Sequence, residues 1–478
     1  MFNKKDTPLT KSGEAIDKMR DIIIATFADF NLPVEMLEVV EGYREYHFYL
    51  QPKQPVRMKV IAGFLDDLRY ALSCDDVEIL APVPNKKYIG ITVPKSGPLV
   101  PVNIEDVLHS KELLQSSPLT VPVGFDEENQ VHSIDLARMP HLLVAGVTGS
   151  GKSILMHSLI NALIEKNSPE QLRLILCDPK RVEMVQYAKL PHLLTPVITD
   201  AKKTVRALSW AIKEVERRYD ILQSEGLSDI SSYHKKVYKP ARIQWEKAGE
   251  KESEAMELPE SMPYIVIVID EISDFMQAYP REVESILVRL TQMSRAVGVH
   301  LVITTQRPTA SVITSSVSAG LPSRIAMSVT SYVDSRVIIG VNGAEKLRGE
   351  GDMLLVVAGE QKPIRLQGYF ISEEDVAKRV KEWIALDEGM LDALDLNEGN
   401  EASSMFGTLS ADGNEDDELY EDAKVAVLRA GKASTSYLQR SLRIGYSRAA
   451  RLMDLLEEGG VIGPQDGSRP RDVLADND

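Results

Sequence analysis

The amino-acid sequence predicts an α/β protein whose main domain is a parallel sheet covered by helices. A small α+β domain is expected before it and a winged helix-turn-helix after it. Apolar strands alternate with amphipathic helices from about residue 118 to about 370, which is typical of a parallel sheet. A glycine-rich loop at 146–153 follows one of these strands and opens a helix. Helical patterns and a short apolar strand fill residues 421–478.

Composition limits the classes to which the protein can belong. A chain of 478 residues is too long for one ordinary core, so two to four domains are expected. The chain is 44% hydrophobic and 26% charged, as soluble globular proteins are, and no apolar run approaches the length of a membrane span. The two cysteines, Cys74 and Cys177, form no disulfide framework. We expect a cytoplasmic chain with no membrane segment.

The net charge of −16 argues against nucleic-acid binding only if it is spread evenly. Residues 387–422 contain thirteen Asp or Glu and no Lys or Arg. We therefore interpret 387–420 as an acidic disordered linker.

The first part of the chain shows helical and alternating patterns but no catalytic constellation. Helices are predicted at 16–27 and 61–72, and strands at 43–50, 77–80 and 89–93. We assign 1–34 as an N-terminal segment and 35–117 as an α+β domain for packing or ring assembly.

The main domain is assigned to 118–386. Strands are predicted at 172–177, 264–269 and 299–305, and helices at 204–222 and 283–297. The polar stretch 224–262 is interpreted as a surface insertion. Residues 421–478 form the third domain, the winged helix-turn-helix.

The loop at 146–153 matches the pattern G-x-x-x-x-G-K-[ST] of a phosphate-binding loop. Its glycines allow the backbone N–H groups to surround a phosphate, and the following helix directs its positive end at the same place. Lys152 is expected to contact the β- and γ-phosphates, and Ser153 to bind Mg²⁺. The predicted cofactors are ATP and Mg²⁺, and the nucleotide-binding residues are Gly146, Val147, Thr148, Gly149, Ser150, Gly151, Lys152 and Ser153.

Polar residues directly follow two further predicted strands. Asp270 and Glu271 follow the apolar run 264–269, where a carboxylate reaches the carboxyl end of the sheet. We expect Asp270 to bind Mg²⁺ and Glu271 to orient or deprotonate the attacking water. Gln306 follows the strand 299–305, where it either senses the γ-phosphate or makes a strand-end hydrogen bond.

Arginines gather in the C-terminal domain with no acidic residue among them. Arg440, Arg443, Arg448 and Arg451 lie on the second and third predicted helices. Because Arg448 and Arg451 are three residues apart, they share one helix face. A solvated charged face is the alternative, but arginines on a helix-turn-helix favour DNA binding.

Taken together, the chain resembles the FtsK/SpoIIIE family of bacterial DNA translocases from about residue 35 onward. The stretches that carry this resemblance, beyond the phosphate-binding loop itself, are residues 139–146, 174–180, 191–197, 305–308, 343–347 and 443–453.

The resemblance implies a RecA-like motor between an α and a γ domain, assembled as a homo-hexamer around double-stranded DNA with ATP between subunits. It implies that Arg295 is an arginine finger acting on the neighbouring subunit, and that Arg307 and Arg336 contact the DNA backbone. A site-specific recombinase is a further partner expected through the γ domain.

The chain departs from the family pattern at three positions. Ser318 and Tyr332 stand where lysine is common, which predicts a less basic pore. Ser447 stands where the recognition helix usually has asparagine, so the preferred DNA sequence is expected to differ. The family's amino-terminal membrane domain is not in this sequence, so the chain is either a soluble member or a motor excised from a longer protein. In the second case, the missing domain would place it at the membrane or the division septum.

The function predicted is therefore ATP-driven translocation along duplex DNA in chromosome segregation at cell division. Two alternatives remain open: a related ATPase that powers protein secretion, and a DNA-bound tether with a regulatory ATPase.

Overall fold

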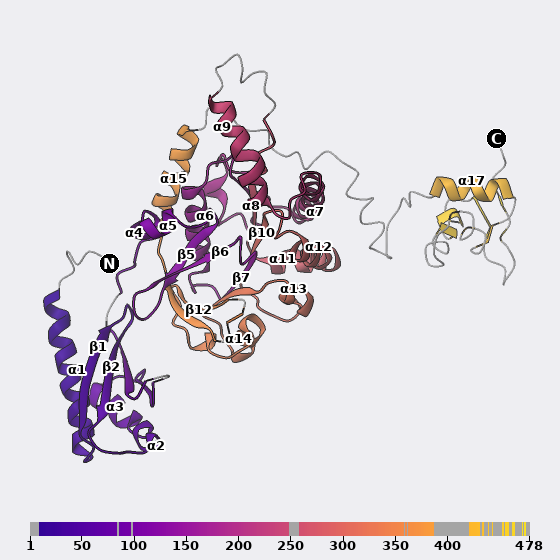
Figure 1. The fold of residues 1–478 in the computed structure, drawn as a ribbon. Helices are drawn as coiled ribbons and strands as arrows, with labels where there is room; N and C mark the ends of the chain where they lie inside the picture. The colour runs from indigo at the N-terminus through magenta and orange to yellow at the C-terminus, as the bar shows by residue number, and fades with distance from the viewer. Residues whose placement is uncertain are drawn as a thin grey trace. The chain divides into compact units, whose positions relative to one another are not determined.

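A computed structural model of the chain describes residues 9–83, 86–96, 99–247, 258–357, 359–360 and 362–386, together with parts of 420–474. Those parts are residues 420–430, 433–434, 438, 442, 452–453, 455–457, 461–463, 471 and 473–474. The chain divides into two compact units, Met1–Leu394 and Asp395–Asp478. Each unit is described by itself (Figure 1).

The first unit begins with a helix and a four-stranded antiparallel sheet, in the strand order β1-β2-β4-β3. The elements are α1 (Leu9–Asp29), β1 (Val34–Glu41), β2 (Glu45–Pro52), α2 (Met58–Ala62), α3 (Leu65–Leu72), β3 (Glu78–Leu80) and β4 (Ile89–Pro94). Phe27 from α1, Phe48 from β2 and Leu68 from α3 are fully buried in one core.

Two predictions for this sheet were incomplete. The helix predicted over 61–72 is two helices, because α2 ends at Ala62, with Gly63 as its C-cap, and α3 begins at Leu65. Strand β1 was missed. Its register shifts between Met36 and Glu38, and such a bulge interrupts the apolar–polar alternation by which a strand is recognised.

The larger sheet of the first unit has nine strands in the order β6-β5-β13-β12-β11-β7-β10-β9-β8. These are β5 (Thr120–Phe125), β6 (Val131–Asp135), β7 (His141–Ala145), β8 (Leu172–Cys177), β9 (Tyr264–Ile269), β10 (Val299–Thr305), β11 (Ser323–Met327), β12 (Asp352–Val356) and β13 (Ile364–Gly368). The three apolar strands predicted at 172–177, 264–269 and 299–305 are confirmed as β8, β9 and β10.

The prediction of a parallel sheet was correct for only part of this sheet. Strands β11, β7, β10, β9 and β8 are parallel, whereas β12, β13, β5 and β6 join them antiparallel. The short connections β5–β6 and β12–β13 explain the difference, because a hairpin can join only antiparallel strands.

Helices flank the larger sheet (Figure 1). They are α4 (Glu105–Leu108), α5 (Lys111–Leu114), α6 (Lys152–Lys166), η1 (Val185–Tyr187), α7 (Ala201–Ser224), α8 (Ile230–Tyr233), η2 (His234–Tyr238), α9 (Lys239–Lys247), α11 (Ile272–Ala278), α12 (Pro280–Met293), α13 (Ser315–Ala319), α14 (Tyr332–Ile339), η3 (Ala344–Lys346) and α15 (Glu373–Leu386). The stretch 224–262 is only partly the surface insertion that was predicted, because Ile230 and Tyr233 of α8 are buried.

The parallel strands bring the predicted catalytic segments to one edge of the sheet. Ala145 at the end of β7 pairs with Thr305 at the end of β10, and Cys177 at the end of β8 pairs with Ile269 at the end of β9. The phosphate-binding loop, Gln306, Asp178 and Asp270 therefore all follow strands that end at this edge.

The second unit contains α17 (Tyr420–Ala430), whose Ala423 and Val427 are buried with Leu438, Leu452 and Leu456. Helix α17 covers the beginning of the region 421–478, where helical patterns were predicted. Arg440, Arg443, Ser447, Arg448 and Arg451 lie outside the described residues, as does the linker predicted at 387–420 up to residue 419.

None of the helices in the described part of the chain combines the length and the apolar character needed to cross a membrane.

Candidate nucleotide-binding site

The phosphate-binding loop connects β7 to α6 and is fixed by backbone contacts to neighbouring strands. The N–H of Gly146 donates to Thr305 O at 3.2 Å, and the N–H of Val147 donates to Ser328 O at 2.9 Å. Gly151, which caps α6, has a φ of 100°, and a Cβ there would lie 2.6 Å from Gly351 N. Glycine is therefore required at 151 both by the backbone angle and by the neighbouring chain.

Lys152 lies in the first turn of α6 and contacts the end of β9. Its Nζ donates to Asp270 Oδ1 at 2.8 Å and to Thr304 Oγ1 at 3.1 Å. Lys152 and Asp270 are 4% and 1% exposed, so the ion pair is shielded from water. A nucleotide phosphate would compete with Asp270 for this ammonium group.

Glu271 is buried and held by several donors. Its Oε1 accepts hydrogen bonds from Ser273 Oγ at 2.6 Å and Thr305 Oγ1 at 2.8 Å, and its Oε2 accepts one from the Gln306 N–H at 3.0 Å. Burial by itself would raise the pKa of Glu271. The three hydrogen bonds and the nearby Lys180 outweigh it, so the pKa lies below the ordinary value and the carboxyl is ionised.

Glu271 also has an unusual backbone conformation, with a φ of 55° and a ψ of 71° just before α11. A residue other than glycine in this left-handed region costs about 1–3 kcal/mol and is most often seen at functional sites. The conformation places the Glu271 carboxylate against Thr305 and Gln306, at the end of the adjacent strand.

Gln306 contacts the phosphate-binding loop directly, since its Oε1 accepts a hydrogen bond from Thr148 Oγ1 at 3.2 Å. The structure thus brings Lys152, Asp270, Glu271 and Gln306 together with the loop. This contact fits a residue that responds to the γ-phosphate. It fits equally well the alternative that Gln306 only makes a hydrogen bond at the end of its strand.

Glu183, which was not predicted, contacts Ser153. The Ser153 Oγ donates to Glu183 Oε1 at 2.6 Å, and the hydrogen bond from His157 holds the pKa of Glu183 below its ordinary value. Ser153, Asp270 and Glu183 supply the hydroxyl and carboxylate oxygens that Mg²⁺ prefers, so the residues present fit the predicted ion.

Asp178 explains how Glu183 reaches this position. Its carboxylate accepts hydrogen bonds from five consecutive backbone N–H groups, those of residues 180–184, at 2.9–3.1 Å. The resulting turn also places Lys180 Nζ 3.5 Å from Glu271 Oε2. The sequence signal was the Asp-Pro-Lys triplet that directly follows β8, to which no role had been assigned.

Arg295 lies at the opposite edge of the sheet. It precedes β10, whereas the phosphate-binding loop follows β7, and the two strands are parallel neighbours. Seven residues of strand correspond to roughly 20 Å, too far for Arg295 to contact the loop of its own chain. Arg295 is exposed beside a pocket that is also lined by Tyr219, Asp229 and Tyr264.

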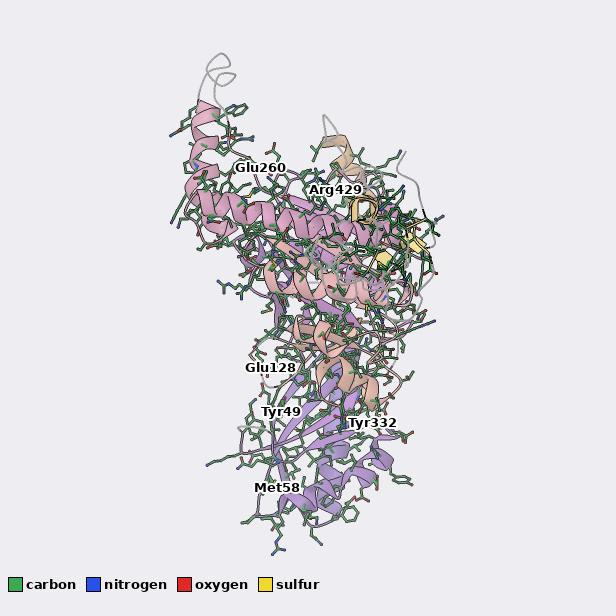
Figure 2. All side chains as sticks on the ribbon, turned by 90° about the vertical axis from the view of Figure 1, so that its right-hand side faces the viewer. Tyr49, Met58, Glu128, Glu260, Tyr332 and Arg429 are labelled. Atoms are coloured by element: carbon green, nitrogen blue, oxygen red, sulfur yellow. The ribbon has the colours of Figure 1, made fainter. Side chains whose placement is uncertain are left out.

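The two predicted DNA-contacting arginines of the first unit are exposed. Arg307 directly follows Gln306, and Arg336 lies on α14 with its guanidinium 5.7 Å from the ring centroid of Tyr332. Tyr332 is itself at the surface (Figure 2). The Nε of Arg336 donates a hydrogen bond to Asn342 Oδ1 at 2.8 Å. Tyr332 thus lies against the neighbouring arginine and carries no charge of its own.

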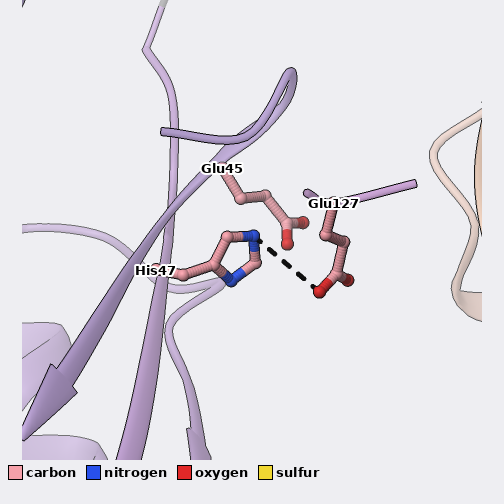
Figure 3. A group of neighbouring side chains, drawn as sticks. All are labelled: Glu45, His47 and Glu127. Atoms are coloured by element: carbon pink, nitrogen blue, oxygen red, sulfur yellow. Dashed lines mark ion pairs between the residues drawn. The ribbon is translucent and has the colours of Figure 1, made fainter. Parts of the chain in front are cut away.

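A second cluster of metal-ligand residue types lies away from this site. Glu45 and His47 of β2 and Glu127 of the β5–β6 turn place ligand atoms within 4.8 Å of one another (Figure 3). However, Glu45 is already paired with Arg348 at 3.3 Å and Arg365 at 3.5 Å. Two guanidinium groups at the same carboxylate disfavour a cation, so we interpret the cluster as an ionic contact between the two sheets.

Comparison with known proteins identifies three models of one family along the chain. The FtsK/SpoIIIE family model matches residues 104–310, the FtsK alpha domain model residues 2–95, and the FtsK gamma domain model residues 414–476.

Named relatives align with almost the whole chain. "DNA translocase FtsK" of Caldanaerobacter subterraneus subsp. tengcongensis is 42% identical over 98% of this chain and 62% of its own length. "DNA translocase SftA" of Bacillus subtilis is 39% identical over 96% of this chain and 46% of its own length. The chain thus spans about half to three-fifths of the length of these curated relatives.

A solved structure supports the fold. The pCW3 conjugation coupling protein TcpA, determined as a monomer with ATPγS, superposes with a TM-score of 0.52 at 20% identity. The superposition covers 76% of this chain and 99% of TcpA. The phosphate-binding loop, the buried Lys152–Asp270 pair, the ionised Glu271 and the three family models lead to one conclusion: this chain is a P-loop ATPase that belongs to the FtsK/SpoIIIE family.

Proposed function

We propose that the protein hydrolyses ATP to move along double-stranded DNA as a homo-hexameric ring during chromosome segregation at cell division. The observation that carries this proposal is the division of the catalytic groups between two edges of one sheet. Lys152, Asp270 and Glu271 gather at the carboxyl edge, and Arg295 lies at the amino edge. A complete site then needs a second copy of the chain, as in a ring. The names of the relatives supply the DNA substrate.

The described residues divide the work of hydrolysis among them. Lys152 and the backbone of the phosphate-binding loop bind the phosphates. Ser153 and Asp270 would hold Mg²⁺, which would supply positive charge at the phosphoryl oxygens. Glu271, ionised and rigidly held, accepts the proton of the attacking water. Gln306 connects the same site to Arg307 and so to DNA.

We propose the domain boundaries expected from the sequence: an N-terminal segment (1–34), an α+β domain (35–117), the motor (118–386), an acidic linker (387–420) and a winged helix-turn-helix (421–478). The motor would contact the DNA backbone through Arg307 and Arg336. The C-terminal winged helix would read DNA through Arg443, Ser447, Arg448 and Arg451, and would bind a site-specific recombinase. Family membership and the match of the gamma domain model to residues 414–476 support this part of the proposal.

The ATPase rate of the purified chain with and without plasmid DNA tests the proposal. Translocation predicts strong stimulation by long duplex DNA and weak stimulation by a duplex shorter than the ring footprint. Displacement of a third strand from a triplex at the end of the duplex would show movement. Stimulation by a protein substrate instead of DNA would favour the secretion ATPase, and DNA binding without strand displacement would favour the tether.

Glu271→Gln is expected to bind ATP normally. Its rate of ATP hydrolysis should be about 10²–10⁴-fold lower than that of the wild type, because the attacking water loses its base. Glutamine has the same shape, and the hydroxyls of Ser273 and Thr305 can turn to accept from its amide. Single-turnover hydrolysis and equilibrium ATP binding measure the two effects separately. Hydrolysis at the wild-type rate would assign the base to another residue.

Thr305→Val is expected to move the acid limb of the ATPase pH profile to higher pH. The Thr305 hydroxyl stabilises ionised Glu271, so its removal raises the pKa of this carboxyl, and the base becomes protonated at a higher pH. A hydrogen bond to a charged group is worth about 1.5–3 kcal/mol, which corresponds to a shift of roughly one to two pH units.

The control for this experiment is Thr291→Val, which removes a hydroxyl that donates to a carbonyl within α12. Its pH profile should overlay that of the wild type. Equal acid limbs for Thr305→Val and the wild type would contradict the role assigned to Glu271.

A further inference from the structure

The turn between β1 and β2 in the small sheet contacts a segment that lies beside the phosphate-binding loop. Arg44, in this turn, donates through NH2 to Gly349 O and Glu350 O, both at 3.1 Å, and through Nε to Gln367 Oε1. Glu45, the next residue, pairs with Arg348 at 3.3 Å. Two adjacent residues of opposite charge therefore bind residues 348–351, which we call the bridging segment.

The bridging segment is in direct backbone contact with the phosphate-binding loop. The N–H of Gly351 donates to Ser150 O at 2.8 Å, and the N–H of Glu350 lies 3.4 Å from Gly149 O. The same segment is fixed from its other side, where Gln367 Nε2 donates to Glu350 O at 2.9 Å.

These contacts determine how the loop presents its own N–H groups. In a planar trans peptide the C=O and the following N–H point in opposite directions. Gly351, by holding the Ser150 carbonyl, therefore sets the direction of the Gly151 N–H at the start of α6. Backbone N–H groups in this position are the ones that bind phosphate in a phosphate-binding loop.

The conformation of the bridging segment depends on these partners. Glu350 has a φ of 52° and Gly351 a φ of 89°, both in the left-handed region, which non-glycine residues adopt only when their surroundings require it. The Arg44 guanidinium binds two successive carbonyls of this strained turn and so stabilises it.

From this chain of contacts we infer that Arg44 is a positioning residue for ATP binding, which acts on the phosphate-binding loop through residues 348–351. The small N-terminal sheet is thereby coupled to the nucleotide site. The coupling works in both directions. Because the contacts of Arg44 with the bridging segment favour ATP binding, bound ATP in turn stabilises these contacts. The inference rests on nucleotide binding at the loop and not on movement along DNA.

Arg44→Ala in the full chain tests the inference. We expect the Kd for a fluorescent ATP analogue, and the KM for ATP, to rise about fivefold or more, the range typical of coupling between sites. The kcat at saturating ATP should stay near the wild-type value, because Arg44 touches none of the reacting groups. Arg20→Ala is the matched control. Arg20 is a partly exposed arginine of α1 in the same part of the chain and pairs with Asp17, so the Kd of Arg20→Ala should equal that of the wild type.

Thermal unfolding distinguishes positioning from simple support of the fold. If Arg44 only supported the fold, Arg44→Ala would lower the Tm measured without nucleotide. The rise in Tm caused by ATPγS would then be the same in this variant as in the wild type. Positioning predicts a smaller rise in Arg44→Ala than in Arg20→Ala. Hydrogen exchange should show ATPγS protecting residues 41–45 in the wild type and not in Arg44→Ala.

Arg44→Lys keeps the charge but cannot bind two carbonyls with a planar fork, so its Kd should lie between those of the wild type and Arg44→Ala. It replaces the alanine variant if that variant does not fold. Equal Kd values for the wild type and whichever Arg44 variant folds would overturn the inference. Failure of the wild type to bind the analogue would instead count against the nucleotide site itself.

Discussion

Replacing Lys152 with alanine is expected to reduce ATP hydrolysis by about 10²–10³-fold or more, the usual effect of removing one preorganised charge-stabilising donor. The Lys152 ammonium group is 4% exposed and enters the site at the start of α6, where no described cation other than Lys180 lies close to the catalytic carboxylates. The steady-state ATPase rate of the purified variant measures the loss.

Lys152 also contributes to the stability of the fold through its ion pair with Asp270. Among the described residues, Lys152→Ala leaves the buried carboxylate of Asp270 with the Thr304 hydroxyl as its one side-chain partner, and breaking such a pair costs about 3–5 kcal/mol. The double variant Lys152→Ala/Asp270→Asn removes the uncompensated charge and should recover much of the stability while staying inactive. Activity that returned with stability would show that Lys152 acts through the fold alone.

Arg295→Ala is expected to reduce ATP hydrolysis by about 10³–10⁵-fold while leaving ATP binding intact, as the loss of an arginine finger does. The physical reason is the position of Arg295 at the amino edge of the sheet, roughly 20 Å along β10 from its own phosphate-binding loop. Its guanidinium can reach a γ-phosphate only on a neighbouring copy.

Mixing Arg295→Ala with Lys152→Ala tests this geometry. Some interfaces of a mixed ring would pair an intact loop with an intact Arg295, so part of the activity should return on mixing. Arg281→Ala, which changes an exposed arginine of α12, is the control and should retain activity. An inactive mixture of the two variants would place Arg295 in the site of its own subunit or outside catalysis.

Local sequence patterns were sufficient for the central strands and for the phosphate-binding loop. Strands β8, β9 and β10 are buried on both faces, so their residues form continuous apolar runs with sharp ends. Asp270 and Gln306 could be assigned because a polar residue directly after such a run must lie at the carboxyl end of its strand.

Sequence patterns could not predict strand direction or the position of Glu183, because both depend on residues that are distant in the sequence. Strands β12 and β13 are as short as β7, and their antiparallel direction follows from a hairpin that joins them at the far side of the sheet. Glu183 is placed by five hydrogen bonds to Asp178, and its contact with Ser153 needs α6 and β8 to lie close together.

The sequence by itself predicted the chemistry of the nucleotide site: a phosphate-binding loop and two carboxylates that follow a buried strand. These features depend on residues within a few positions of one another, which periodicity and motif spacing report directly, whereas Arg295 was named only through the family resemblance. Only the tertiary structure decided that Arg295 and Lys152 lie at opposite edges of one sheet, and that Arg44 reaches the phosphate-binding loop through residues 348–351. Arg44 and Gly349 are 305 positions apart in the chain. Their contact exists because the turn between β1 and β2 of the four-stranded sheet packs against the nine-stranded sheet, where Arg44 also meets Gln367 of β13, and no local pattern reports such packing.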